Sequence, residues 1–321
     1  DAENGKVLWY HPYPAELGDK FFEGGPTSTP TVDGDRVYAI GRAGDLFCFQ
    51  ASSGKVLWSK QLSKDFGIPV PGWGFGGSPL ALGTQLLLNA GEAGLALDKT
   101  DGHLLWKSAA AESGYTTPLL LPGDDGLVLF SSGKAYLAVD PRTGKEAWRV
   151  KWVTNYGVNA ADPIVRDGQM FLSTGYGKGA ALFAIGAGEP RVVWQSRVLR
   201  TQINPAVQVG GFLYGIDGDA ASEPGALQKA QLKCVEFATG VEKWTFPLAD
   251  VGSVSAADGK LLVLSGDGEL LIGPASPEGF APTSRAKVLR GRCWSVPVLS
   301  GGRLFCRNAE GQVLSIDVKK P

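Results

Sequence analysis

Aromatic, amide and charged residues recur shortly before a series of apolar strand starts, and they are the residues best suited to binding. They could supply hydrogen-bond donors and acceptors together with flat rings around a ligand. Glu23, Asn159 and Asp162 could hold a hard cation such as calcium, which takes oxygen ligands. The alternative is that these groups bond neighbouring backbone and ordered water. The candidate residues are Glu23, Trp73, Tyr115, Tyr156, Asn159, Asp162, Gln202, Asn204, Arg292 and Trp294.

Histidine chemistry is nearly excluded, because the chain contains only His11 and His103. A histidine-centred zinc site or a Ser-His-Asp triad is therefore not expected. His103 occupies a turn position and is expected to be solvated. Acid–base work by carboxylates alone remains open, although no spacing singles out a pair.

Two loops could be mistaken for ligand motifs. Residues 72–77 are rich in glycine, but no helix is expected after them to meet a phosphate. We interpret them as a flexible loop that presents Trp73 and Phe75 to the funnel at one end of a central channel or to a partner. Asp217, Asp219 and Glu223 could be read as a calcium loop, but a polar hairpin insertion is the preferred interpretation.

A motif of eleven residues repeats along the chain and must position the candidate residues. Its fullest form, Ala-x-Asp-x-x-Thr-Gly-Lys-x-x-Trp, predicts a strand, a tight turn and a second strand that ends in Trp. Glycine supplies the positive φ of the turn, and a recurring Trp suggests a ring wedged between neighbouring units. The copies span residues 48–58, 96–106, 138–148 and 234–244, with a degenerate copy at 184–194 and a partial one at 1–9.

Each repeat also begins with a short apolar start, usually after Pro, so that four antiparallel strands occupy roughly 40 to 50 residues. This pattern predicts an all-β propeller of seven blade equivalents in a single domain, residues 1–321. The last blade stops after its third strand, and residues 5–9 would supply the missing fourth. We therefore expect Val7 and Trp9 to pair with residues 312–317 and to cover that sheet edge. The seven starts lie at Pro30, Pro79, Pro118, Pro163, Pro205, Ser255 and Pro297.

Composition narrows the class of partner. The 321-residue chain has a formal net charge of −1 and 44% apolar residues, which gives no reason to expect nucleic-acid or anionic-membrane binding. No apolar run approaches the ~18 residues of a membrane span. Of the four cysteines, Cys48, Cys234 and Cys306 lie in expected strands and are most simply small core residues. No disulfide is expected between Cys293 and Cys306.

The repeated motif resembles the tryptophan-docking motif of the pyrroloquinoline-quinone-type β-propeller repeat. This resemblance covers essentially the whole chain. The family includes quinoprotein alcohol dehydrogenases and the scaffold lipoprotein of the outer-membrane β-barrel assembly machinery. Both branches have eight blades, so three further strands upstream would give eight here. In the dehydrogenases an adjacent cysteine pair covers the quinone, and this sequence has no such pair.

The resemblance implies two functions. The first is a non-catalytic scaffold of the bacterial envelope, periplasmic or otherwise exported and monomeric, that binds a protein or an extended polymer at the channel mouth without a cofactor. The alternative is a dehydrogenase of alcohols or sugars, or a quinone-binding relic, that holds pyrroloquinoline quinone with calcium. The missing cysteine pair favours the scaffold.

Overall fold

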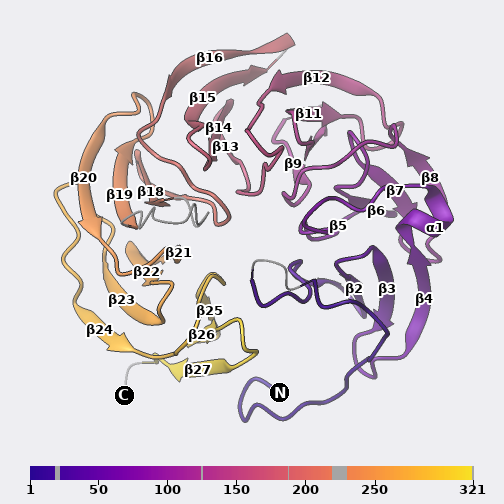
Figure 1. Cartoon of the computed structure of the whole chain (residues 1–321), viewed down its shortest axis with the longest axis horizontal. Coiled ribbons are helices and arrows are strands. Elements are labelled where there is room, and N and C mark those ends of the chain that lie inside the picture. The colour runs from indigo at the N-terminus through magenta and orange to yellow at the C-terminus, as the bar shows by residue number, and fades with distance from the viewer. Residues whose placement is uncertain (19–21, 124–125, 187, 219–229, 320–321) are drawn as a thin grey trace. The chain divides into compact units, whose positions relative to one another are not determined.

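The computed structural model describes residues 1–18, 22–123, 126–186, 188–218 and 230–319. Contacts divide the chain into two compact units, residues 1–160 and 161–321. In each unit, successive antiparallel sheets follow one another in chain order (Figure 1). The all-β fold class with seven blades is confirmed, whereas the single domain over residues 1–321 stays a prediction.

The first unit contains three four-stranded sheets. Its one described helix, α1 (Leu62–Phe66), follows the first sheet. The strands are β1 (Thr31–Asp33), β2 (Arg36–Ile40), β3 (Asp45–Gln50) and β4 (Val56–Gln61); β5 (Leu80–Leu82), β6 (Gln85–Leu88), β7 (Leu95–Asp98) and β8 (Leu104–Lys107); β9 (Leu119–Leu120), β10 (Val128–Ser131), β11 (Ala135–Val139) and β12 (Glu146–Lys151).

The second unit contains three four-stranded sheets and one sheet of three described strands. Its strands are β13 (Ile164–Arg166), β14 (Gln169–Thr174), β15 (Gly179–Gly186) and β16 (Gly188–Ser196); β17 (Val207–Val209), β18 (Phe212–Asp217), β19 (Gln231–Glu236) and β20 (Glu242–Pro247); β21 (Ser253–Ala257), β22 (Lys260–Leu264), β23 (Glu269–Pro274) and β24 (Ser284–Lys287); β25 (Val298–Ser300), β26 (Arg303–Arg307) and β27 (Val313–Asp317). Within the described residues, no helix is long and apolar enough to cross a membrane.

The core lies mainly on the second and third strands of the six four-stranded sheets. In β10 and β11 every residue is buried. Such strands are covered on both faces, and side chains that point to either face are therefore mostly apolar. Fourth strands such as β8 are mostly exposed. Side chains of adjacent sheets pack together, as Tyr38 and Leu46 do with Leu86.

The motif tryptophans pack on the turn of the following repeat. The indole Nε1 of Trp58 donates to the carbonyl of Lys99, and that of Trp106 donates to Pro141. The rings cover the turn glycines so closely that a Cβ added to Gly102 would lie 2.8 Å from the ring of Trp58. The other tryptophans with the same kind of bond are Trp9, Trp194 and Trp244, which donate to Ala51, Phe237 and Ser276.

Opposite Trp58, Trp106 and Trp244, the third strand carries a small residue followed by a β-bulge. Trp58 faces Cys48, and Trp244 faces Cys234, with a register shift directly after each cysteine. Both cysteines are fully buried free thiols. The expectation that they are small core residues is therefore confirmed.

The expected strand at residues 5–9 is wrong in this structure. Residues 5–10 have no strand assignment. Trp9 instead packs on Gly54 of the first repeat and lies 5.5 Å from the ring of Phe49. The pairing of Val7 and Trp9 with residues 312–317 stays a prediction.

Candidate binding sites in the two units

Three predicted site residues are linked in the first unit. The backbone N–H of Trp73 donates to the hydroxyl oxygen of Tyr115 over 3.3 Å. The backbone N–H of Tyr115 donates in turn to the carbonyl of Asn159 over 2.8 Å. The Trp73 ring lies 6.0 Å from the ring of Phe22, which the guanidinium of Arg42 approaches to 5.5 Å. This unit therefore gathers flat rings and a cation around the loop at Trp73.

Asn159 is the anchor of this cluster rather than an exposed ligand group. Its side chain is fully buried, and its Nδ2 donates to the carbonyls of Ser132 and Trp152 over 2.8 and 3.1 Å. The Oδ1 atom is buried without a hydrogen-bond partner among the described residues. The amide nitrogen of Asn159 therefore bonds neighbouring backbone, as the alternative interpretation of these residues expects.

The remaining predicted residues of this region are exposed. Tyr156 has 66% of its surface exposed, and Glu23 and Asp162 are exposed as well. Glu23 and Asn159 belong to the first unit and Asp162 to the second, so a shared calcium site stays a prediction.

Three metal-ligating side chains do come together elsewhere, within 4.8 Å, at Asp98, Asp101 and His103. Asp98 ends β7, and the other two lie on the turn that follows, where Nδ1 of His103 is 2.7 Å from Oδ1 of Asp101. Hydrogen bonds within the turn account for this arrangement, since the Asp101 carboxylate also accepts the backbone N–H of His103. His103 is exposed, as predicted.

The glycine-rich loop presents only one of its two aromatic residues. Trp73 is partly exposed. The prediction for Phe75 was wrong, because its side chain is 3% exposed and belongs to the core. Its backbone N–H donates to the carbonyl of Arg42, and Gly44 leaves room for its ring. Because Gly44 has no side chain, the ring of Phe75 has space to pack in the core.

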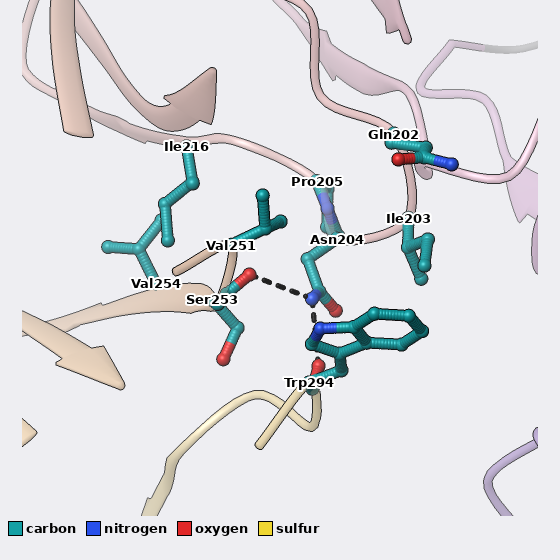
Figure 2. Close-up of a pocket in the computed structure, with 10 residues that line it drawn as sticks. Gln202, Ile203, Asn204, Pro205, Ile216, Val251, Ser253, Val254 and Trp294 are labelled. Atoms are coloured by element: carbon teal, nitrogen blue, oxygen red, sulfur yellow. Dashed lines mark hydrogen bonds between the residues drawn. The ribbon is translucent and has the colours of Figure 1, made fainter. Parts of the chain in front are cut away.

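The second unit brings Gln202, Asn204 and Trp294 to one cavity of about 10 Å³ (Figure 2). Nδ2 of Asn204 donates to the carbonyl of Gly252 over 3.1 Å and to that of Trp294 over 2.7 Å. Asn204 therefore bonds the backbone of a residue that lies 90 positions further along the sequence. The cavity is also lined by Ile203, Pro205, Ile216, Val251, Gly252, Ser253 and Val254.

Polar groups at the rim complete this cavity. The guanidinium of Arg292 lies 4.5 Å from the centroid of the Trp294 ring, a cation–π contact. Nε2 of Gln202 donates to the hydroxyl of Tyr176 over 2.9 Å. Four of the ten predicted site residues thus form one cluster in the second unit. Whether this cluster and that of the first unit share one channel mouth stays a prediction.

Asp217 has a role that the sequence pattern did not reveal. Its side chain is 3% exposed and pairs with Arg200 over 2.9 Å and with Lys233 over 3.4 Å. The backbone N–H of Arg200 also donates to this carboxylate, so Asp217 fixes the segment that leads to Gln202. Asp219 and Glu223, the other members of the suspected calcium loop, lie outside the described residues.

Asp217 belongs to a wider set of buried polar residues at the ends of second strands. Asn89 donates to Ser131 and to the carbonyl of Thr116, and Asn308 donates to the carbonyl of Arg290. These bonds tie the strand ends to loops of the sheet that follows or precedes. The signal in the sequence is a polar residue that ends an apolar strand, as in Asn89, Ser131, Ser173, Asp217, Ser265 and Asn308.

Seven successive antiparallel sheets, tied by tryptophans to the turns that follow, define a β-propeller of the pyrroloquinoline-quinone-type repeat. The chain belongs to the family described as "Outer membrane protein assembly factor BamB", whose sequence profile matches residues 1–246.

Relatives of known identity cover most of this chain. It is 23% identical over 296 residues to outer membrane protein assembly factor BamB of Yersinia pestis, a match that spans 88% of this chain and 72% of the relative. The protein of the same name from Burkholderia pseudomallei (strain K96243) is 24% identical over 289 residues, which span 89% and 72% of the two chains.

Solved structures share the fold. BamB from Moraxella catarrhalis superimposes with a TM-score of 0.69 at 18% identity, over 90% of this chain and 84% of that one. A europium-containing methanol dehydrogenase superimposes with a TM-score of 0.61 at 13% identity, over 97% and 76%. At these identities the likeness concerns the fold alone.

Proposed function

We propose that this chain is a non-catalytic scaffold in the assembly of outer membrane proteins, located on the periplasmic side of the envelope. The observation that carries this proposal is membership of the BamB family over residues 1–246. The two curated relatives, each matched over most of this chain, are both named assembly factors. We expect the chain to act as a monomer that binds another protein.

The surfaces around Trp73 and Trp294 are the proposed contact points for that protein. Each combines a partly exposed indole with a nearby guanidinium, Arg42 in the first unit and Arg292 in the second. Tryptophan and arginine are over-represented among residues that dominate binding energy at protein interfaces. The amide groups of Gln202 and Asn204 add hydrogen-bonding capacity, which suits a polypeptide partner.

The test places a photo-crosslinking amino acid at Ile203, which is 39% exposed beside Trp294. A matched control carries it at Val192 on β16, which is 57% exposed. We expect position 203, and not position 192, to crosslink to one defined subunit of the assembly machinery in intact cells. The double change Trp73→Ala, Trp294→Ala should abolish that product. A double variant that retains every wild-type interaction would show that the assigned surfaces are wrong.

The residues do not fit a quinone cofactor. No two of the four cysteines are adjacent in the sequence, so the disulfide that covers the quinone in the dehydrogenases has no counterpart. Addition of pyrroloquinoline quinone and calcium, followed by absorbance and dye-reduction measurements with alcohols and sugars, tests this conclusion. Stoichiometric binding with turnover would overturn the scaffold proposal.

A further inference from the structure

Trp294 differs from the motif tryptophans in its hydrogen bonding. Among the described residues, the indole N–H groups of Trp9, Trp58, Trp106, Trp194 and Trp244 each donate to a backbone carbonyl, over 2.6 to 3.2 Å. The Nε1 atom of Trp294 is buried but has no acceptor among the described residues. A buried donor without an acceptor costs about 1–3 kcal/mol, so an oxygen from outside the described chain would stabilise it.

The cavity limits what that oxygen can belong to. Its volume of about 10 Å³ is about that of one water-sized group. Pro205, Ile216, Val251 and Val254 contribute apolar walls. A charged group would lose its hydration against these walls at a large cost. A neutral acceptor of the size of a single carbonyl oxygen fits both the volume and the lining.

The residues around the Trp294 indole offer contacts to the rest of a bound peptide. Figure 2 shows the nitrogen-bearing edge of the ring next to the Asn204 side chain. Ile203 and Gln202 lie at the upper right of that view. The Asn204 Nδ2 beside it donates to the carbonyls of Gly252 and Trp294, and an amide nitrogen accepts no hydrogen bond, so it does not satisfy the indole N–H. Ile203 is 39% exposed, and its side chain offers an apolar surface to a chain that crosses the ring.

We propose that Trp294 binds a backbone carbonyl oxygen from an extended segment of a protein partner, which enters the cavity and accepts a hydrogen bond from Nε1. This inference rests on the proposed function and deepens it by naming the chemical group that the partner supplies. It reproduces between two proteins the indole-to-carbonyl bond that the motif tryptophans make within this one.

The direct test uses N-methylacetamide, a mimic of one peptide bond, and protein labelled with ¹⁵N at the indole nitrogens. Substitution Trp294→Phe assigns the Trp294 resonance. We expect this resonance alone to move saturably during the titration, while those of Trp58, Trp106 and Trp244 stay in place because their N–H groups are already bonded. Acetate should bind more weakly. No saturable shift of Trp294, which would indicate water only, or tighter binding of acetate would overturn the proposal.

The same variants separate this inference from the function on which it rests. Trp294→Phe removes the N–H group and keeps a ring, whereas Trp294→Ala removes both. We expect Trp294→Phe to weaken binding of the crosslinked partner by about tenfold. If Trp294→Ala weakens binding and Trp294→Phe does not, the scaffold function stands and the carbonyl inference is wrong. If neither change weakens binding, the assigned surface and the inference both fail.

Discussion

At the scale of single residues, the indole group decides how one repeat contacts the next. Trp106 places its ring on Gly144 and its N–H on the carbonyl of Pro141. The ring excludes water from the turn, and the N–H satisfies a carbonyl that the turn leaves without a ladder partner. One side chain thus performs both tasks, which explains why Trp rather than Phe ends the motif.

Trp148 should be the most costly of these residues to truncate. It lies on β12 opposite Ala138 and is 7% exposed. Replacement by Ala should lower the free energy of unfolding by about 3–5 kcal/mol, the usual range for a buried aromatic residue. Urea denaturation measures this, with Trp148→Phe as a control that keeps an aromatic ring. A loss below ~1 kcal/mol would contradict the prediction that Trp148 joins neighbouring blades.

Tyr38 should make the protein sensitive to alkali. Its side chain is fully buried and its hydroxyl donates to the carbonyl of Lys99. Burial, assisted by the Cys48 thiol, raises the pKa of Tyr38 from 10.0 to about 12. Above pH 10 the unfolded state therefore loses the phenolic proton before the folded state does, and stability falls as the pH rises towards 12.

The variant Tyr38→Phe tests this dependence. It should lose about 1 kcal/mol near neutral pH with the hydrogen bond, and its stability should decline less steeply between pH 10 and 12 than that of the wild type. Denaturation at a series of pH values measures both effects. Part of the decline should persist, because burial also raises the pKa of Cys234 to about 11. An unchanged slope would show that Tyr38 titrates normally.

At the scale of elements, the turn glycine and the bulge before it act together. The bulge after Cys234 shifts the register of β19 against β20, and Gly240 then turns the chain with a φ of 73°. Because Gly240 has no side chain, the ring of Trp194 can lie directly on the turn. The hairpin is therefore both a connection within one blade and a docking surface for another.

Gly240→Ala should cost more than an ordinary turn glycine does. A Cβ at this position would lie 2.8 Å from the Trp194 ring. Gly34→Ala is the matched control, since Gly34 has a φ of 59° and nothing within 4 Å of an added Cβ. We expect the control to lose about 1–2 kcal/mol from backbone strain and Gly240→Ala to lose about 1–3 kcal/mol more from overpacking. Equal losses would mean that the ring gives way without cost.

At the scale of the whole molecule, one edge of the seventh sheet has no covering strand among the described residues. Its last strand, β27, pairs only with β26 among the described residues, and Val313 on β27 is 70% exposed. An exposed apolar edge strand invites pairing with other chains. Residues 5–9 carry the motif that would supply a covering strand, although they form no strand in this structure.

Deletion of residues 1–10 should therefore promote aggregation. Trp9→Ala is the control, because it removes the ring from Gly54 and keeps the backbone that could pair with β27. We expect Trp9→Ala to lower stability and the deletion to lower it and to produce concentration-dependent oligomers, measured by light scattering. If both variants stay monomeric to the same degree, the edge is protected in another way and the closure prediction is wrong.

Much of the fold could be predicted from local signals. Pro79 and Pro118 mark the starts of the second and third sheets, and each is followed directly by the first strand of its sheet. The candidate sites could be predicted from the sequence only in part. Equivalent positions in successive repeats identified Asn204 and Trp294, but not that Asn204 would hold the backbone of Trp294. Phe75 was misplaced because its burial depends on the space beside Gly44, which no local pattern reveals.

The sequence by itself determined the repeating hairpin, the seven sheets and the tryptophan that ends each full motif. These features depend on φ preferences, strand alternation and apolar burial, which act over a few residues. Only the tertiary structure decided which polar groups are engaged and which are left open. The pairing of Asp217 with Arg200, and the lack of an acceptor for the Trp294 N–H among the described residues, depend on distances between residues far apart in the chain. Such distances are fixed by packing, because a hydrogen bond forms only within a few tenths of an ångström of its preferred length.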